Sequence, residues 1–235
     1  MSTVTSPAAA APLRLVAVDL YRDIHKGIRS ELFAVTEQAG RLDPASRADR
    51  IALASHVGST VDLLVEHAEH EDGAIQPVLE EVLPALADRV AAEHEAVERR
   101  LRGLAALSAE TVEAPGSARR GAVHRLYVEL AAFTSAYLDH QDVEERLVMP
   151  ALEDAVGVEA VAGIHAAIVG AIPPDQMARS LAVMLPAMNV DDRTELLGGL
   201  RAGAPDEVFA AVWSLAGSVL AATDRDALAG RLGIA

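Results

Sequence analysis

Four long segments of this sequence carry apolar residues at a spacing of three or four, which places those side chains on one face of an α-helix. A single histidine interrupts each apolar stripe, and in two segments a glutamate follows that histidine four residues later. The stripes contain His25, His67 with Glu71, His94, and His140 with Glu144. Four helices that face one another can bury all four stripes, so the sequence predicts an all-α fold built on an up-down four-helix bundle.

Composition supports helices and divides the chain into three parts. Ala, Leu and Val dominate, and aromatic residues make up 3% of the chain, a balance that favours helices over strands. Residues 1–12, rich in Ala, Ser, Thr and Pro, are expected to form a disordered tail, with helical periodicity from Leu13 onward. Residues 13–157 hold the predicted bundle, and residues 158–235, where prolines separate short helical segments, are predicted to form a helical appendage.

Charge and residue types exclude several classes of function. The net charge of -15 argues against a nucleic-acid partner, because phosphate backbones are bound by clustered basic surfaces. The absence of cysteine excludes disulfides, thiolate metal sites and thiol catalysis. The sequence shows neither a secretory start nor an apolar run of about 18 residues, so we expect a cytoplasmic protein with no membrane partner.

Two stretches repeat the same spacing of ligand-type residues: "HAEHEDGAIQPVLE" from His67 and "HQDVEERLVMPALE" from His140. In each, a histidine and a glutamate one helical turn apart point into the bundle core. Unpaired imidazoles and carboxylates are costly in a dry core, and a metal ion would give each of them a partner. The nitrogen and oxygen ligands total at least six, which favours a dinuclear iron or manganese site over zinc, which usually takes four.

With these motifs the chain resembles the hemerythrin-like family, whose members carry an HHE cation-binding domain. The resemblance covers about residues 13–155 and rests on the order His, His-x-x-x-Glu, His, His-x-x-x-Glu, with Pro and Leu after each pair. It implies a left-handed four-helix bundle that holds two bridged iron ions and binds O2, peroxide or NO. It also implies that Glu71 and Glu144 bridge the metals and that four histidines are terminal ligands. These are His25, His67, His94 and His140.

The third helix departs from the oxygen-carrying members of that family, which have a His-x-x-x-His there, and points to a non-carrier branch with a C-terminal extension. Here the second position of that pair is Glu98. Either Glu98 is an extra ligand, or His70 supplies one, or water fills the open position; Glu98 and His70 are also typical of ordinary surface residues. Tyr21 and Tyr137 lie about one turn before His25 and His140, where a hydroxyl could reach a bound oxygen species or simply pack in the core.

An extra carboxylate or an open position suits reaction with O2 or peroxide better than reversible storage. The sequence therefore favours a di-iron oxidoreductase, with a small organic substrate admitted under the appendage as one version of it. Two alternatives stay open: a non-enzymatic protein that senses or stores O2, NO or iron, and a structural helical protein whose histidines have no role.

Overall fold

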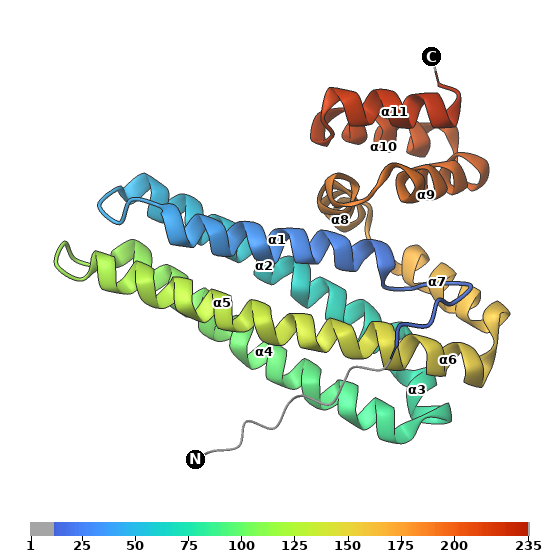
Figure 1. The fold of residues 1–235 in the computed structure, drawn as a ribbon, viewed down its shortest axis with the longest axis horizontal. Coiled ribbons are helices and arrows are strands. Elements are labelled where there is room, and N and C mark those ends of the chain that lie inside the picture. The colour runs from blue at the N-terminus through green and yellow to red at the C-terminus, as the bar shows by residue number, and fades with distance from the viewer. Residues whose placement is uncertain (1–11, 235) are drawn as a thin grey trace.

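The computed structural model describes residues 12–234, and within them every regular element is a helix. Four long helices form the bundle and run alternately up and down (Figure 1). These are α1 (Arg22–Arg41), α2 (Arg47–Ala74), α4 (Pro84–Glu113) and α5 (Arg119–Val143). Each packs against its neighbours in a ring, α1 on α2, α2 on α4, α4 on α5 and α5 on α1. The predicted all-α bundle is confirmed.

The apolar stripes seen in the sequence meet in the centre of the bundle. Leu32 of α1, Leu64 of α2, Leu101 of α4 and Phe133 of α5 belong to one buried cluster. The imidazoles and carboxylates lie beside this cluster, toward the end of the bundle where α3 and α6 are attached. The site is therefore built on rigid, closely packed helices.

The first helix begins later than the sequence suggested. Helical periodicity is expected from Leu13, but α1 starts at Arg22, and Leu15 is 87% exposed. Asp19 explains the start, because its Oδ1 accepts hydrogen bonds from the backbone N–H groups of Tyr21 and Arg22. The preceding segment is instead tied to α6, where Arg14 forms an ion pair with Asp154. The predicted tail, residues 1–12, lies outside the described residues except for Pro12.

Both repeated stretches interrupt their α-helix close to the glutamate: α2 ends three residues after Glu71, and α5 ends directly before Glu144. After Glu71, α2 ends and the short α3 (Gln76–Val82) begins with Pro77 in its first turn. After His140, the chain passes through a π-helical turn, η1 (Glu144–Val148), and then α6 (Met149–Val156) with Pro150 in its first turn. Proline lacks the N–H and crowds the carbonyl four residues earlier, so each proline favours a break or distortion in the preceding turn.

The C-terminal part forms five further helices: α7 (Val158–Ala171), α8 (Pro174–Ala187), α9 (Val190–Gly203), α10 (Asp206–Val219) and α11 (Ala222–Leu232). α7 packs on α2 and α6, and its Val161 and Ile164 join the cluster that contains Leu79 and Leu152. The remaining four helices, which we term the C-terminal lobe, have a small core of their own, centred on Leu185 and Leu197.

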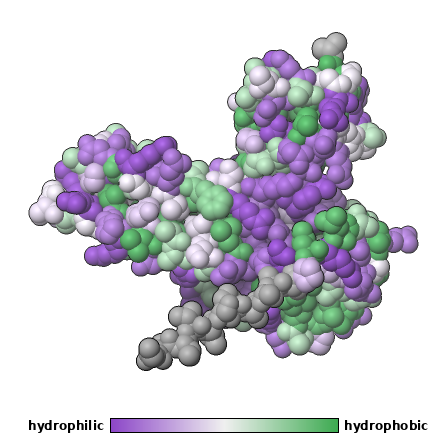
Figure 2. Space-filling model, in the orientation of Figure 1, coloured by the Kyte–Doolittle hydropathy of each residue, from purple (hydrophilic) through white to green (hydrophobic). Residues whose placement is uncertain are grey.

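The C-terminal lobe docks on the outer side of α1. A Cβ added at Gly27 would lie 3.1 Å from the side chain of Val183 and 3.2 Å from the backbone of Met184, so glycine permits the close approach of α8. Ion pairs surround this contact, among them Arg22 with Glu195 and Lys26 with Asp192. Figure 2 shows the lobe rising from the bundle, with hydrophilic residues where the two meet.

No single helix within residues 12–234 combines the length and apolar character needed to cross a membrane. The segments 119–156 and 158–171 meet the length and composition requirement only as a pair, and they are bent by 117° relative to each other.

Candidate metal centre

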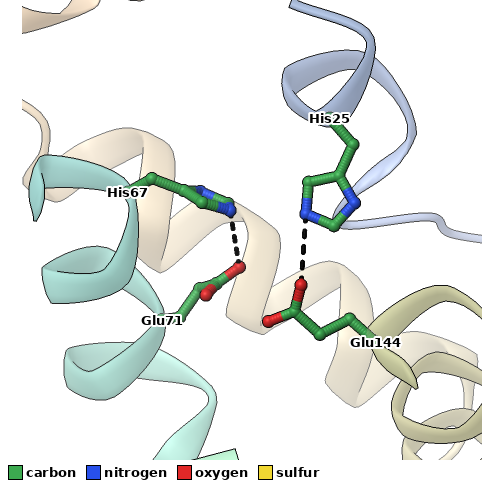
Figure 3. Close-up of side chains that lie close together, drawn as sticks. All are labelled: His25, His67, Glu71 and Glu144. Carbon is green, nitrogen blue, oxygen red and sulfur yellow. Dashed lines mark ion pairs between the residues drawn. The ribbon is translucent and has the colours of Figure 1, made fainter. Parts of the chain in front are cut away.

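Six ligand-type side chains meet in the bundle, and each is at most 8% exposed. Every bundle helix contributes at least one, as the stripes predicted. They are His25 of α1, His67 and Glu71 of α2, His94 of α4, His140 of α5 and Glu144 at the start of η1. Figure 3 shows four of them, with His67 facing Glu71 and His25 facing Glu144 across the space between the helices.

These side chains form two groups that share both carboxylates. The His25–His67 group contains Glu71 and Glu144, and so does the His94–His140 group. In each group, one ligand atom from every residue lies within 4.8 Å of the others. The six residues thus form two overlapping groups, each of which could hold a metal ion.

The two oxygens of each carboxylate divide between the groups. Glu71 Oε1 lies 3.0 Å from His67 Nε2, and its Oε2 lies 3.3 Å from His94 Nε2. Glu144 Oε2 lies 3.4 Å from His25 Nε2, and its Oε1 lies 3.1 Å from His140 Nε2. A carboxylate that presents one oxygen to each of two groups has the arrangement needed to bridge two cations.

Most of these inward atoms have no hydrogen-bond partner, although they are buried. This holds for the Nε2 atoms of His25, His67 and His94 and for all four oxygens of Glu71 and Glu144. A buried polar atom without a partner costs about 1–3 kcal/mol, and more if it is charged. Seven such atoms lie close together, and a metal ion would give them partners, so the donor set fits a metal site.

Carboxylates outside the centre hold three of the four imidazoles in place. The Nδ1 atoms of three rings face acid oxygens: His25 faces Glu145 at 2.9 Å, His94 faces Asp72 at 2.7 Å, and His140 faces Glu93 at 2.9 Å. A proton on Nδ1 leaves the Nε2 lone pair for a metal and fixes the direction of the ring. The imidazoles are therefore oriented to coordinate through Nε2.

The two shared glutamates have different electrostatic surroundings. Burial and the nearby Glu144 raise the pKa of Glu71 to about 8. Burial also opposes the charge of Glu144, but the histidines around it, led by His140 and His94, outweigh burial and hold its pKa well below the usual range. In the metal-free protein at neutral pH, Glu71 is therefore mostly protonated and Glu144 is ionised.

The pKa values of the histidines also shift in opposite directions. Burial, with His25 nearby, lowers the pKa of His67 to about 3, so its ring is neutral. Burial opposes the charge on His94 and His140 as well, but their carboxylate partners outweigh it and raise the pKa of His94 to about 12 and that of His140 to about 9. Without metal, the His94–His140 group therefore carries protons that a cation would replace.

Tyr21 and Tyr137 both lie at the centre, each 2% exposed. The Tyr21 ring stacks on His25 with the ring centroids 5.0 Å apart, and the Tyr137 ring meets the edge of His140 at 5.5 Å. Burial, with the charges of the two shared glutamates, raises the pKa of each phenol well above its usual range. Both tyrosines are thus protonated, and Tyr21 also lines a narrow crevice beside Glu71 and Glu144.

The structure does not bring Glu98 or His70 into either group. The Glu98 side chain is 62% exposed and forms an ion pair with Arg102 one turn away. His70 is partly exposed on α2 and lies outside both groups, although it is only one residue from Glu71. The interpretation of Glu98 as an ordinary surface acid fits this placement.

Sequence reasoning missed Glu93 and Arg29. Glu93 precedes His94 in the chain but contacts His140 of α5. Arg29, one turn after His25, donates two hydrogen bonds to Glu145 at 2.8 and 3.0 Å. The spacing of Arg29 from His25 was visible in the sequence, whereas the contact of Glu93 depends on how α4 and α5 pack.

Comparison with known protein families agrees with this geometry. Residues 16–152 match the model of the hemerythrin HHE cation-binding domain, which covers more than half of the chain. The chain belongs to this family. Comparisons of the chain with curated proteins and with solved structures gave no match.

The match ends at Leu152, within α6, so α7 and the C-terminal lobe lie outside the matched region. All six ligand-type residues fall inside it. A cation-binding domain is what the unpaired atoms of the two groups require, and the His/Glu cluster fits a metal site of this kind.

Proposed function

We propose that this hemerythrin-family protein holds two iron ions, one in the His25–His67 group and one in the His94–His140 group, and reacts with O2 or peroxide as an oxidoreductase. The observation that carries the proposal is the division of the oxygens of Glu71 and Glu144 between the two groups. Manganese prefers similar nitrogen and oxygen ligands and is the second candidate metal.

The number of protein ligands supports reaction with a small molecule. Each group offers two imidazoles and one oxygen from each shared carboxylate, which is four ligand atoms. A metal ion that takes six ligands would therefore have positions left for a small molecule. Bound iron would supply redox chemistry and charge stabilisation at those positions.

The chain's own residues would shield the reaction and supply a proton donor. The shared glutamates are at most 6% exposed, so bulk water is excluded from the centre. Tyr21 stays protonated beside the crevice that reaches both glutamates, where its hydroxyl can donate a hydrogen bond to a bound oxygen species. The crevice is too narrow for an organic molecule in this arrangement, which argues against a larger substrate.

One observation favours the alternative of a sensor for O2, NO or iron. The C-terminal lobe docks on α1 at Gly27, two residues after His25. A change in the position of His25 would therefore be passed directly to the lobe contact.

Purification followed by metal analysis and optical spectroscopy tests the proposal. We expect about two iron or manganese atoms per chain, lost in His67→Ala and retained in Glu98→Ala. Loss of peroxide with stoichiometric release of O2 supports the enzyme, and a stable oxygen or nitrosyl adduct without turnover supports the sensor. Wild-type metal content in His67→Ala would show that the site assignment is wrong.

A further inference from the structure

The two groups differ in the carboxylates that contact the Nδ1 atoms of their imidazoles, on the side of each ring away from the shared glutamates. In the His94–His140 group, both rings are backed by a carboxylate, Asp72 at 2.7 Å and Glu93 at 2.9 Å. In the His25–His67 group, only His25 has such a partner, Glu145. Within the described residues, the Nδ1 atom of His67 contacts no carboxylate.

The single carboxylate behind the His25–His67 group is also neutralised. Arg29 binds both oxygens of Glu145, at 2.8 and 3.0 Å, and one of these oxygens also faces His25. The Arg29 side chain is 30% exposed, so water screens this pair only in part. The positive charge of Arg29 therefore weakens the electrostatic effect of Glu145 on the His25 ring.

The carboxylates of the other group keep more of their charge. Asp72 is 52% exposed, so water screens part of its charge, but it contacts His94 at 2.7 Å and no Lys or Arg within the described residues. Glu93 pairs with Arg89 through one oxygen while the other faces His140. Arg89 is 47% exposed, which weakens its effect on Glu93. A carboxylate behind an imidazole raises its basicity and hence its affinity for a metal.

We propose that the two metal positions are inequivalent: the His94–His140 group binds the first ion, and the Arg29–Glu145 pair keeps the His25–His67 group as the weaker, second position. Arg29 is thus a positioning residue that acts through Glu145 and His25. The inference rests on the proposed dinuclear site. It predicts a protein that can hold one ion with its second position open to exchange.

Calorimetric titration of the metal-free full chain with Co²⁺ tests the order of binding. We expect two steps that differ in affinity by about tenfold or more, since loss of a partner behind a ligand typically costs 10–100-fold in metal affinity. Asp72→Asn should weaken the first step by about tenfold, and Arg29→Met should strengthen the second step and narrow the gap. The matched control is Glu95→Gln, which removes a charge next to His94 from a 76% exposed side chain whose one ion pair among residues 12–234 is with Arg99.

Crystals loaded with one equivalent of Co²⁺ give a direct readout, because anomalous scattering locates the ion. Density between His94 and His140 supports the inference, and density between His25 and His67 overturns it. Two steps of equal affinity would overturn the inference while leaving the dinuclear site intact. Failure of the wild-type chain to bind any Co²⁺ would overturn the proposed function as well.

Discussion

Replacing Glu71 with methionine should leave the metal-free protein at least as stable as the wild type, whereas Glu144→Met should destabilise it. The two glutamates share both ligand groups but differ in charge. Glu71, with a pKa near 8, is mostly protonated at neutral pH, so its removal leaves no buried charge unpaired. Glu144 is ionised and lies 3.1–3.6 Å from three imidazoles, those of His25, His94 and His140.

The difference in charge between Glu71 and Glu144 gives the expected size of each change in stability. Replacing a poorly paired buried polar group by an apolar one of similar volume is often neutral or stabilising, by about 1–3 kcal/mol here. Removing one partner of a buried ion pair costs roughly 3–5 kcal/mol, because the other charges stay buried. For a chain of this length about 1 kcal/mol shifts the Tm by roughly 2–4 °C. We therefore expect a rise of up to roughly 12 °C for Glu71→Met and a fall of roughly 6–20 °C for Glu144→Met.

Thermal unfolding of the two variants after chelation, followed by circular dichroism at pH 7, measures these shifts. Both variants should also lose the rise in Tm that added metal gives the wild type, because each removes a shared ligand. The sign is set by the folded-state pKa of Glu71. A raised carboxyl pKa means that this group destabilises the fold as the pH rises above its ordinary value, and methionine removes that penalty. Equal falls in Tm for the two variants would refute the assigned charge states.

Three further predictions test other parts of the structure. Gly27→Ala should fail to give the roughly 0.5–1 kcal/mol gain in unfolding free energy expected of Gly58→Ala, since an added Cβ meets α8 at Gly27 and open space at Gly58; denaturant titration of both compares them. Metal binding at pH 7 should release protons and strengthen as the pH rises, because the pKa of His94 is raised to about 12; calorimetry in buffers of different ionisation enthalpy counts the protons, and a count of zero would contradict the assignment. Glu98→Ala should change the unfolding free energy by no more than about 0.5 kcal/mol, as chemical denaturation would show, since it loses only an exposed pair with Arg102.

The sequence predicted the bundle and the positions of the inward residues because both follow from helical periodicity. His67 with Glu71 and His140 with Glu144 are one turn apart, so a single helix aligns each pair whatever surrounds it. The predicted start of the first helix, at Leu13, was wrong for a related reason. Apolar residues before Tyr21 imitate a helical stripe, and only the capping contacts of Asp19 show that the helix begins at Arg22.

Helical periodicity does not predict the carboxylates that contact the Nδ1 atoms of the ligand histidines. Glu93 lies next to His94 in the sequence, yet it contacts His140 on another helix. Such pairs depend on the rotation of α4 against α5, which packing sets and a single helix does not reveal. Glu98 of α4 is exposed although His94, one turn earlier, is buried, a difference that the spacing of four residues does not predict.

The π-helical turn at Glu144–Val148 determines how α6 is rotated about the helix axis relative to the ligands His140 and Glu144. Its i+5 hydrogen bond, from Met149 to Glu144, accommodates one more residue than an α-turn, so everything after it is rotated by about 100° about the helix axis. Val148 and Leu152 thereby face the apolar cluster that holds α3 and α7, while Glu144 keeps its place with His140. Deleting Leu147 from this turn would leave His140, Glu144 and Glu145 in place but would rotate α6 by about 100°. The metal ligands and the packing of α6 on α3 and α7 can therefore change independently, provided that the deletion follows Glu145.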